Sequence, residues 1–308
     1  MPFTPSHAVV ALPFLRTPLV PGAIAIGSMT PDVPLFFPVG PDYWFTHSWP
    51  GALVADLPIA AALLLLWRIL LRPAVPQLTS RWLAERWPAS WTASPADAWR
   101  ELTGTPANHI SSANRIRPAP EIGRPTPIGP ARHRICSILL VLASLALGIA
   151  THLVWDDFTH PGRWGSLLIP ALDDRLGPFL IAEWAHYLSS VFGLAIIAAW
   201  GIRWLRHRMP QPPRSVPSQL LPAPLRIAAW IAVPSALLLA TVVALLVYGV
   251  PHDPVATRIL IERAGKGGAA VILVFYAAMS VTIALLAGAA RRRHARDPLK
   301  FGGPPNAT

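Results

Sequence analysis

Long apolar runs separated by short polar stretches dominate the chain. The hydrocarbon core of a bilayer is about 30 Å thick, which takes roughly 20 helical residues to cross. Soluble helices usually keep one polar face, but five runs are both that long and apolar all round. The pattern therefore predicts five transmembrane helices, at residues 51–71, 135–158, 183–205, 227–250 and 269–290.

The first 50 residues follow a different pattern. Residues 8–28 are apolar, but Pro13, Arg16, Pro18 and Pro21 interrupt them. Proline inside a helix costs about 3 kcal/mol, so one continuous span is not favoured. We expect two short half-helices here, broken or re-entrant. The predicted fold class is all-α, a polytopic integral membrane helical bundle of five clear transmembrane helices plus these N-terminal half-helices.

Composition agrees with a membrane protein and limits the chemistry. Hydrophobic residues make up 53% of the chain and charged residues 13%, about half the charge of a soluble domain. The single cysteine, Cys136, excludes an intramolecular disulfide framework and a cysteine-cluster zinc site. A metal site must therefore use His, Asp and Glu.

The basic residues indicate an orientation rather than a nucleic-acid partner. The net charge is +11, but the arginines lie between apolar runs, so we expect no nucleic acid to bind. The basic stretches 72–134, 206–226 and 291–308 alternate with loops 159–182 and 251–268, whose charges nearly balance. The positive-inside rule then predicts a cytoplasmic C-terminus and outward-facing loops.

These features suggest a domain organisation. Within the first basic stretch, the tryptophans of residues 79–102 favour a short amphipathic helix at the membrane surface, and the prolines of 106–130 favour a flexible linker. The predicted parts are N-terminal half-helices with site residues (1–50), a membrane core with a cytoplasmic Pro/Arg-rich insert (51–205, insert 72–134), a cytoplasmic linker (206–226), a transmembrane pair (227–290) and a basic cytoplasmic tail (291–308).

Ionisable residues inside apolar spans are expensive, so they usually pair or carry function. His152 and Asp156 are four residues apart, which places both on one helix face. Together they can bind a divalent cation at about 2.0–2.2 Å. His160 follows four residues later, but it precedes Pro161, which disfavours helical dihedrals. The alternative is that His152 and Asp156 bond only to each other or form a polar helix end.

The predicted topology gathers further polar residues at the same membrane face. Asp32 and His47 fall on the outward side of the first span, and His152, Asp156 and His160 at the outward end of the second. Glu183 and His186 open the third span from that side. Chance would scatter such residues between both faces.

Four motifs carry a resemblance to a known family. They are Met-Pro-Phe-Thr-Pro-Ser-His7, Ile26-Gly-Ser-Met-Thr-Pro-Asp32, Thr46-His47-Ser48 and the block from Thr151 to Pro170. They resemble the DUF4184 group, a bacterial membrane family, and in order they are similar to those of membrane-bound metal-dependent hydrolases. The resemblance covers residues 1 to about 200 and implies a multi-pass protein of the bacterial cytoplasmic (inner) membrane.

A more distant likeness is to zinc-dependent phospholipase C, in which an early His, an Asp, a later His and a His-x3-Asp pair bind zinc. It implies that the metal ligands here are His7, Asp32, His47, His152 and Asp156. The phospholipases also use a later His-x3-Glu, which does not follow His160; Glu183 and His186 have the reversed order and remain possible additional ligands. One or two divalent ions, with zinc favoured, are therefore expected.

These resemblances imply a metal-dependent hydrolase acting on a phosphoester or related bond of a lipid or lipid-linked substrate at the outer membrane face. Asp157 or His160 would orient water or accept its proton. Arg163 and Arg175 would hold an anionic head group.

Two other function classes stay open. One is a non-catalytic membrane protein with a structural metal or a His/Asp helix-pairing cluster. The other is an ion-coupled transporter. Asp56 lies a few residues inside the first span, but the spans from residue 227 onward contain no acid, which weakens the transporter hypothesis.

Overall fold

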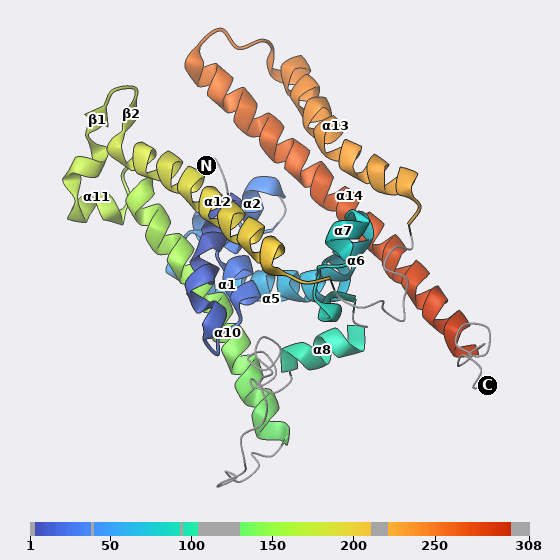
Figure 1. The fold of residues 1–308 in the computed structure, drawn as a ribbon. Coiled ribbons are helices and arrows are strands. Elements are labelled where there is room, and N and C mark those ends of the chain that lie inside the picture. Colours follow the sequence, from blue (N-terminus) through green and yellow to red (C-terminus); the bar gives the residue numbers. More distant parts are fainter. Residues whose placement is uncertain (1–3, 38–39, 93–94, 104–129, 211–220, 297–308) are drawn as a thin grey trace, which may run out of the picture. The chain divides into compact units, whose positions relative to one another are not determined.

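The computed structural model describes residues 4–37, 40–92, 95–103, 130–210 and 221–296. In these parts the chain is helical apart from one hairpin of two-residue strands (Figure 1). Five helical segments are long and apolar enough to cross a membrane: Trp49–Leu78, Arg132–Thr159, Ile181–His207, Ala223–Tyr248 and Val255–Ala289. The prediction of a polytopic helical membrane protein is therefore confirmed.

The first long segment is a continuous run of short elements. It consists of α4 (Trp49–Gly51), the π-helix η3 (Ala52–Asp56), α5 (Leu57–Leu66), the π-helix η4 (Trp67–Leu71) and α6 (Arg72–Leu78). The other four long segments lie in α10 (Pro130–Thr159), α12 (Ile181–His207), α13 (Ala223–Tyr248) and α14 (Pro254–Arg296).

The fifth predicted span forms part of a longer helix that begins earlier than expected. The predicted loop 251–268 is helical from Pro254 onward, which leaves five residues, 249–253, between α13 and α14. Asp253 caps the helix, because its Oδ1 accepts a hydrogen bond of 2.8 Å from the amide of Ala256. The charges that suggested a loop lie on the helix, where Lys266 and Glu262 form an i,i+4 ion pair.

The N-terminal half-helices are confirmed. The 3₁₀-helix η1 (Thr4–Arg16) and the α-helix α1 (Pro21–Gly27) are separated by a bend at residues 17–19. Pro21 occupies the first position of α1, where its missing N–H costs nothing. The shorter elements η2 (Thr30–Asp32), α2 (Val33–Phe36) and α3 (Tyr43–Thr46) follow.

The stretch 79–102 does not form one continuous amphipathic helix. That stretch forms α7 (Arg81–Ala84), η5 (Ala89–Thr92) and α8 (Pro95–Thr103), because prolines before Ala89 and at the start of α8 interrupt a longer helix. Most of the predicted linker at 106–130 lies outside the described residues.

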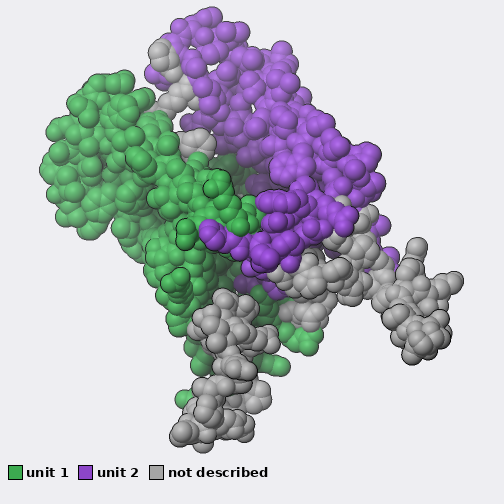
Figure 2. All heavy atoms as spheres, viewed as in Figure 1, with its two compact units in different colours: residues 1–65, 96–206 green, residues 66–95, 207–308 purple. Residues whose placement is uncertain are grey.

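The chain divides into two compact units (Figure 2). Unit 1 comprises Met1–Leu65 and Ala96–Arg206, and unit 2 comprises Leu66–Pro95 and His207–Thr308. Every candidate site residue lies in unit 1. Unit 2 is built on the packing of α13 along α14, with α6 against both. Its buried apolar cluster is Ala74, Leu78, Leu221, Ala229 and Ile283.

A close crossing of α1 and α10 forms the centre of unit 1. At Gly148 an added Cβ would clash with the backbone carbonyl oxygen of Ile24, and at Gly27 with that of Leu145. Glycine at both positions lets the two backbones approach, as small residues do between membrane helices. The surrounding core includes Val20, Ala23, Ala52, Leu64, Ile149 and Leu153.

A short connecting segment joins α10 to α12. It contains α11 (Trp164–Leu168), η6 (Pro170–Asp173) and the antiparallel strands β1 (Arg175–Leu176) and β2 (Phe179–Leu180), with Arg175 opposite Leu180. This connecting segment leads from the end of α10 that carries His152 and Asp156 to the start of α12, where Glu183 and His186 lie.

Candidate metal centre

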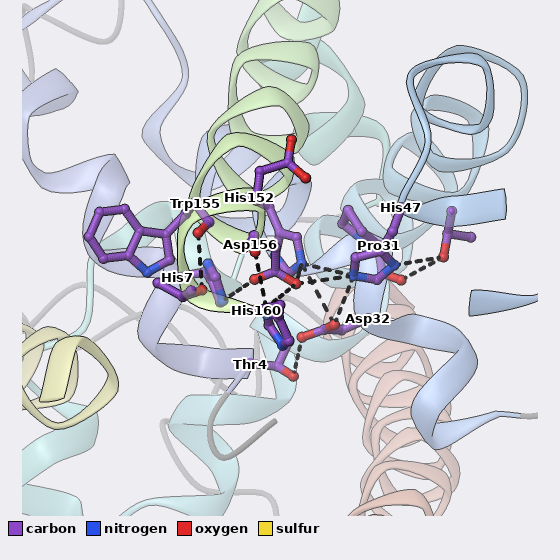
Figure 3. Close-up of polar contacts among 12 residues, drawn as sticks. Thr4, His7, Pro31, Asp32, His47, His152, Trp155, Asp156 and His160 are labelled. Atoms are coloured by element: carbon purple, nitrogen blue, oxygen red, sulfur yellow. Dashed lines mark hydrogen bonds and ion pairs between the residues drawn. The ribbon is translucent and has the colours of Figure 1, made fainter. Parts of the chain in front are cut away.

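Four segments of unit 1 bring ionisable side chains to one place (Figure 3). His7 comes from η1, Asp32 from η2 and His47 from the residue that ends α3, while α10 supplies His152 and Asp156. The side chains of Asp32, His47, His152 and Asp156 have no solvent exposure. The five residues expected as metal ligands therefore form one cluster, although they are spread over 150 residues of sequence.

The crossing of α1 and α10 fixes the orientation of His152. The carbonyl oxygen of Ser28, the residue after Gly27, lies 2.8 Å from His152 Nδ1. A carbonyl can only accept, so Nδ1 carries the hydrogen and, in the neutral ring, Nε2 presents a lone pair. Such an outer hydrogen bond sets the tautomer of histidines that ligate metals.

His47 is held in the same way from another direction. Its Nδ1 lies 2.9 Å from the carbonyl oxygen of Tyr43, one turn earlier in α3, and its ring packs on the Tyr43 ring with centroids 3.8 Å apart. Thr46 anchors α3 against η2 by donating a hydrogen bond of 2.9 Å to the Pro31 carbonyl. His47 Nε2 therefore also faces the cluster.

Five distances connect the four innermost donor atoms of the cluster. His47 Nε2 lies 3.3 Å from His152 Nε2, and it lies 3.5 Å from both Asp32 Oδ1 and Asp156 Oδ2. His152 Nε2 lies 3.6 Å from the same two oxygens. Each of these five distances matches the separation expected of two ligands that lie about 2.0–2.2 Å from one zinc ion and subtend a tetrahedral angle.

The carboxylates of Asp32 and Asp156 have few hydrogen-bond partners among the described residues. Thr4 Oγ1 donates a hydrogen bond of 2.6 Å to Asp32 Oδ2. Asp32 Oδ1 and both oxygens of Asp156 are buried and have no hydrogen-bond partner among the described residues. Buried carboxylates without hydrogen bonds are costly unless a cation neutralises them. These oxygens therefore fit the role of metal ligands.

Without a metal, a proton on His47 takes over part of that role. Burial lowers the pKa of His47, but the carboxylates of Asp156 and Asp32, each 3.5 Å from its Nε2, outweigh burial and raise the pKa to about 9. Burial raises the pKa of Asp32, but His152, His47 and Thr4 lower it below its ordinary value. The metal-free cluster thus contains an imidazolium between two carboxylates.

His7 borders the cluster as a neutral imidazole. Burial and the neighbouring His152 lower the pKa of His7 to about 4. Its ring lies against that of His152 with centroids 4.2 Å apart, and its Nε2 lies 4.0 Å from Asp156 Oδ1. His7, Asp32 and His152 also offer ligand atoms within 4.8 Å of one another.

A family-model comparison covers this whole arrangement. The model described as "Domain of unknown function (DUF4184)" matches residues 1–104 and 118–289, which include every candidate residue and the five long helices. The chain belongs to the DUF4184 family. Comparisons with curated proteins and with solved structures found no match. The DUF4184 description names no activity, so function must be argued from the site.

The remaining candidates of this DUF4184 chain differ in their distance from the cluster. His160 Nδ1 lies 3.6 Å from Asp156 Oδ2, and the His160 side chain is 21% exposed. Asp157 points to Arg163, with 4.0 Å between Oδ1 and Nη1. Arg163 Nη2 in turn donates a 3.4 Å hydrogen bond to the Tyr43 hydroxyl, and Tyr43 packs on His47. Asp157 and Arg163 thus lie at the rim of the cluster.

Arg175 and Glu183 lie elsewhere in the DUF4184 fold. Arg175 is exposed on β1. The Oε2 atom of Glu183 accepts a hydrogen bond of 3.0 Å from the Leu180 amide, at the start of α12, where an acidic residue also suits the helix dipole. His186 instead groups with Asp156 and His160, with ligand atoms within 4.8 Å of one another.

Sequence reasoning missed the residues that orient the ligands. Ser28 and Tyr43 act through backbone carbonyls, which every residue carries, so no residue type signals them. Thr4 lies within the opening motif and is the one member that a sequence signal could have identified.

Proposed function

We propose that this protein is a membrane-embedded metal-dependent hydrolase that cleaves a phosphoester or related bond of a lipid or lipid-linked substrate. The observation that carries the proposal is the buried set of donors from Asp32, His47, His152 and Asp156, in which each imidazole nitrogen lies 3.3–3.6 Å from the other and from both carboxylates, as ligands of one zinc ion do. Two imidazoles and two carboxylates suit zinc, and we take zinc as the first ion to test.

The chemistry of the ion and that of the rim residues complement each other. A bound divalent ion lowers the pKa of water and polarises a phosphoryl or carbonyl oxygen. His160 and Asp157 lie on the side of the cluster where side chains are partly exposed, and either can take up a proton. Burial lowers the pKa of His160, so its ring is a neutral base at pH 7.

Arg163 is the residue best placed to bind an anionic substrate group. Its guanidinium lies 5.6 Å from the Trp44 ring centroid and is hydrogen-bonded to Tyr43, so its position is fixed at the rim. Guanidinium groups bind phosphate oxygens through paired hydrogen bonds. Arg175, on an exposed hairpin, is the weaker candidate for this role.

Location favours a membrane substrate. His152 and Asp156 lie in the last two turns of α10, which ends at Thr159, so they are within about 11 Å of the helix end along its axis. The arginine distribution supports an outward-facing site and a cytoplasmic C-terminus in a bacterial cytoplasmic (inner) membrane. A substrate that reaches such a site along the membrane is a lipid or is linked to one.

One observation favours a second candidate, a structural metal. The set offers four protein donors, and four protein ligands around one ion are typical of closed structural zinc sites. A structural ion, however, does not need the three further imidazoles around the set, those of His7, His160 and His186. This surplus of ionisable groups supports the hydrolase over the structural role.

Metal content and hydrolysis, measured on the same preparations, test the proposal. The detergent-purified full chain should contain zinc or a similar divalent ion and should hydrolyse bis(p-nitrophenyl) phosphate or phosphatidylglycerol in mixed micelles. Asp156→Asn keeps the side-chain volume but removes the charge, so both metal and hydrolysis should be lost. The matched control is His252→Ala, at an exposed position between α13 and α14, which should retain both.

Two results would contradict the hydrolase proposal. Wild-type protein that contains metal but hydrolyses neither probe would support the structural metal instead. Wild-type and Asp156→Asn proteins that are equally metal-free would leave the helix-pairing cluster as the explanation.

A further inference from the structure

Asp156 lies between two groups of imidazoles. On one side are His47 and His152, which belong to the four-donor set described above. On the other side are His160 and His186, whose ligand atoms lie within 4.8 Å of one another and of an Asp156 oxygen. The rings of His160 and His186 meet edge to face with centroids 4.8 Å apart. This second group has no part in the four-donor set.

Hydrogen bonding leaves one nitrogen of His186 as an unused acceptor. Thr159 Oγ1 donates its hydrogen to the Trp155 carbonyl at 3.0 Å. The same oxygen lies 3.4 Å from His186 Nδ1, so it accepts from that nitrogen, which therefore carries the hydrogen. His186 Nε2 then carries a lone pair, and this atom is buried without a hydrogen-bond partner among the described residues. The His186 residue as a whole is 7% exposed.

His160 has the same tautomer for the same reason. Its Nδ1 lies 3.2 Å from the backbone carbonyl oxygen of Asp156, which can only accept. The free lone pair of neutral His160 is therefore on Nε2. Each neutral ring thus has an unused Nε2 lone pair, and a nitrogen of each ring lies within 4.8 Å of an Asp156 oxygen. Both Asp156 oxygens lack hydrogen bonds among the described residues, and a divalent cation is the partner that suits all three groups.

We propose a second divalent-cation site formed by Asp156, His160 and His186, bridged to the first through the Asp156 carboxylate. The inference rests on the proposed function, because it assumes that the first set binds a metal. Bridged two-metal sites hold their ions about 3.5–4 Å apart, and a carboxylate with two free oxygens provides such a bridge.

The two sites would have different coordination. The first has four protein donors and no exposed side chain. The second has three protein ligands, and His160 is partly exposed, so a position remains for an oxygen of the substrate. Three protein ligands with an open position are typical of catalytic zinc sites. The second ion is therefore the one that contacts the phosphoryl group, and Asp157 is left as the group that exchanges protons.

Metal stoichiometry tests this inference without any substrate. The detergent-purified full chain is stripped with a chelator and reloaded with Zn²⁺, and bound metal is measured per chain. We expect two equivalents in the wild-type protein and in His252→Ala, and one equivalent in His186→Ala. One equivalent in wild type, unchanged in His186→Ala, would overturn the second site.

Electron paramagnetic resonance of the Mn²⁺-loaded wild-type chain provides a test that needs no variant. Two ions bridged by a carboxylate give an exchange-coupled spectrum, whereas a single ion gives the six-line spectrum of isolated Mn²⁺. A coupled spectrum is expected, and an isolated one at saturating Mn²⁺ would contradict the inference. His186→Asn, which retains a polar side chain, replaces His186→Ala if the latter does not fold.

The outcomes separate this inference from the proposed function. Hydrolysis by a chain that holds one ion would refute the second site and leave the hydrolase proposal intact. Two coupled ions in a chain that hydrolyses neither probe would support the second site and refute the hydrolase proposal.

Discussion

The Nε2 atoms of His47 and His152 face each other at 3.3 Å, while the Nδ1 atom of each ring is hydrogen-bonded to a backbone carbonyl. In two neutral rings of this tautomer, both Nε2 atoms carry lone pairs and repel each other. A cation between them, or a proton on one of them, removes the repulsion. We therefore expect the proposed metal site to exchange a proton for a metal ion.

That exchange predicts how metal affinity depends on pH. Metal binding requires the His47 lone pair, but the pKa of about 9 keeps His47 protonated at neutral pH in the metal-free protein. Below about pH 9 each bound ion must displace this proton, so affinity should rise with pH, by up to about tenfold per unit, and then level off. Chelator-buffered titrations with Co²⁺ between about pH 7 and pH 10 measure this slope. Affinity independent of pH between about 7 and 9 would contradict the assignment of that proton to His47.

The close crossing of α1 and α10 should control metal affinity from a distance. Gly148→Ala places a Cβ against the Ile24 carbonyl and pushes α1 away, which weakens the hydrogen bond between Ser28 and His152. Loss of such an outer contact typically lowers metal affinity about 10–100-fold, and overpacking costs about 1–3 kcal/mol of stability.

Gly201→Ala is the matched control for this change. Gly201 lies in α12, and an added Cβ there meets open space among the described residues. Alanine should therefore leave metal affinity unchanged and slightly favour the helix. Thermal unfolding and metal titration of both variants make the comparison. Equal metal affinity in Gly148→Ala and wild type would show that the crossing does not position His152.

Asp56 should contribute to neither metal binding nor stability. It is buried in the π-helix η3, and both of its carboxylate oxygens lack a hydrogen-bond partner in the described part of the chain. A buried polar group without a partner costs about 1–3 kcal/mol. Asp56→Leu, with the same branching, should therefore raise the unfolding temperature and leave the metal content unchanged. A loss of metal or a lower unfolding temperature would instead give this carboxyl a functional role, as the transporter hypothesis requires.

The arrangement of basic stretches predicts on which side of the membrane two positions of the chain lie. The five residues 249–253 that separate α13 from α14 should face outward, and Thr308, after the basic tail, should be cytoplasmic. Reporter fusions at Asp253 and Thr308 are expected to report opposite sides. The same side for both fusions would refute the orientation.

The sequence by itself determined the helices and most of the ligand set. Long apolar runs and interrupting prolines act on neighbouring residues, so they predicted the five spans and the two N-terminal half-helices. The i,i+4 spacing of His152 and Asp156 followed from helix geometry alone. The motifs with His7, Asp32 and His47 came from resemblance, and the structure places all three beside that pair. Local rules failed at residues 254–268, where charged residues that suggested a loop lie on one face of a long helix.

Only the tertiary structure decided how these residues meet. His47 and His152 are 105 residues apart in the chain, and which nitrogen each presents depends on carbonyls supplied by separate turns of backbone. The same holds for His186, which lies beside Asp156 and His160, while its neighbour Glu183 caps α12. Helices are set by contacts within one segment, but the separation of two donor atoms is set by how several segments pack. That packing depends on close approaches such as the one at Gly27 and Gly148, which no local pattern in the sequence specifies.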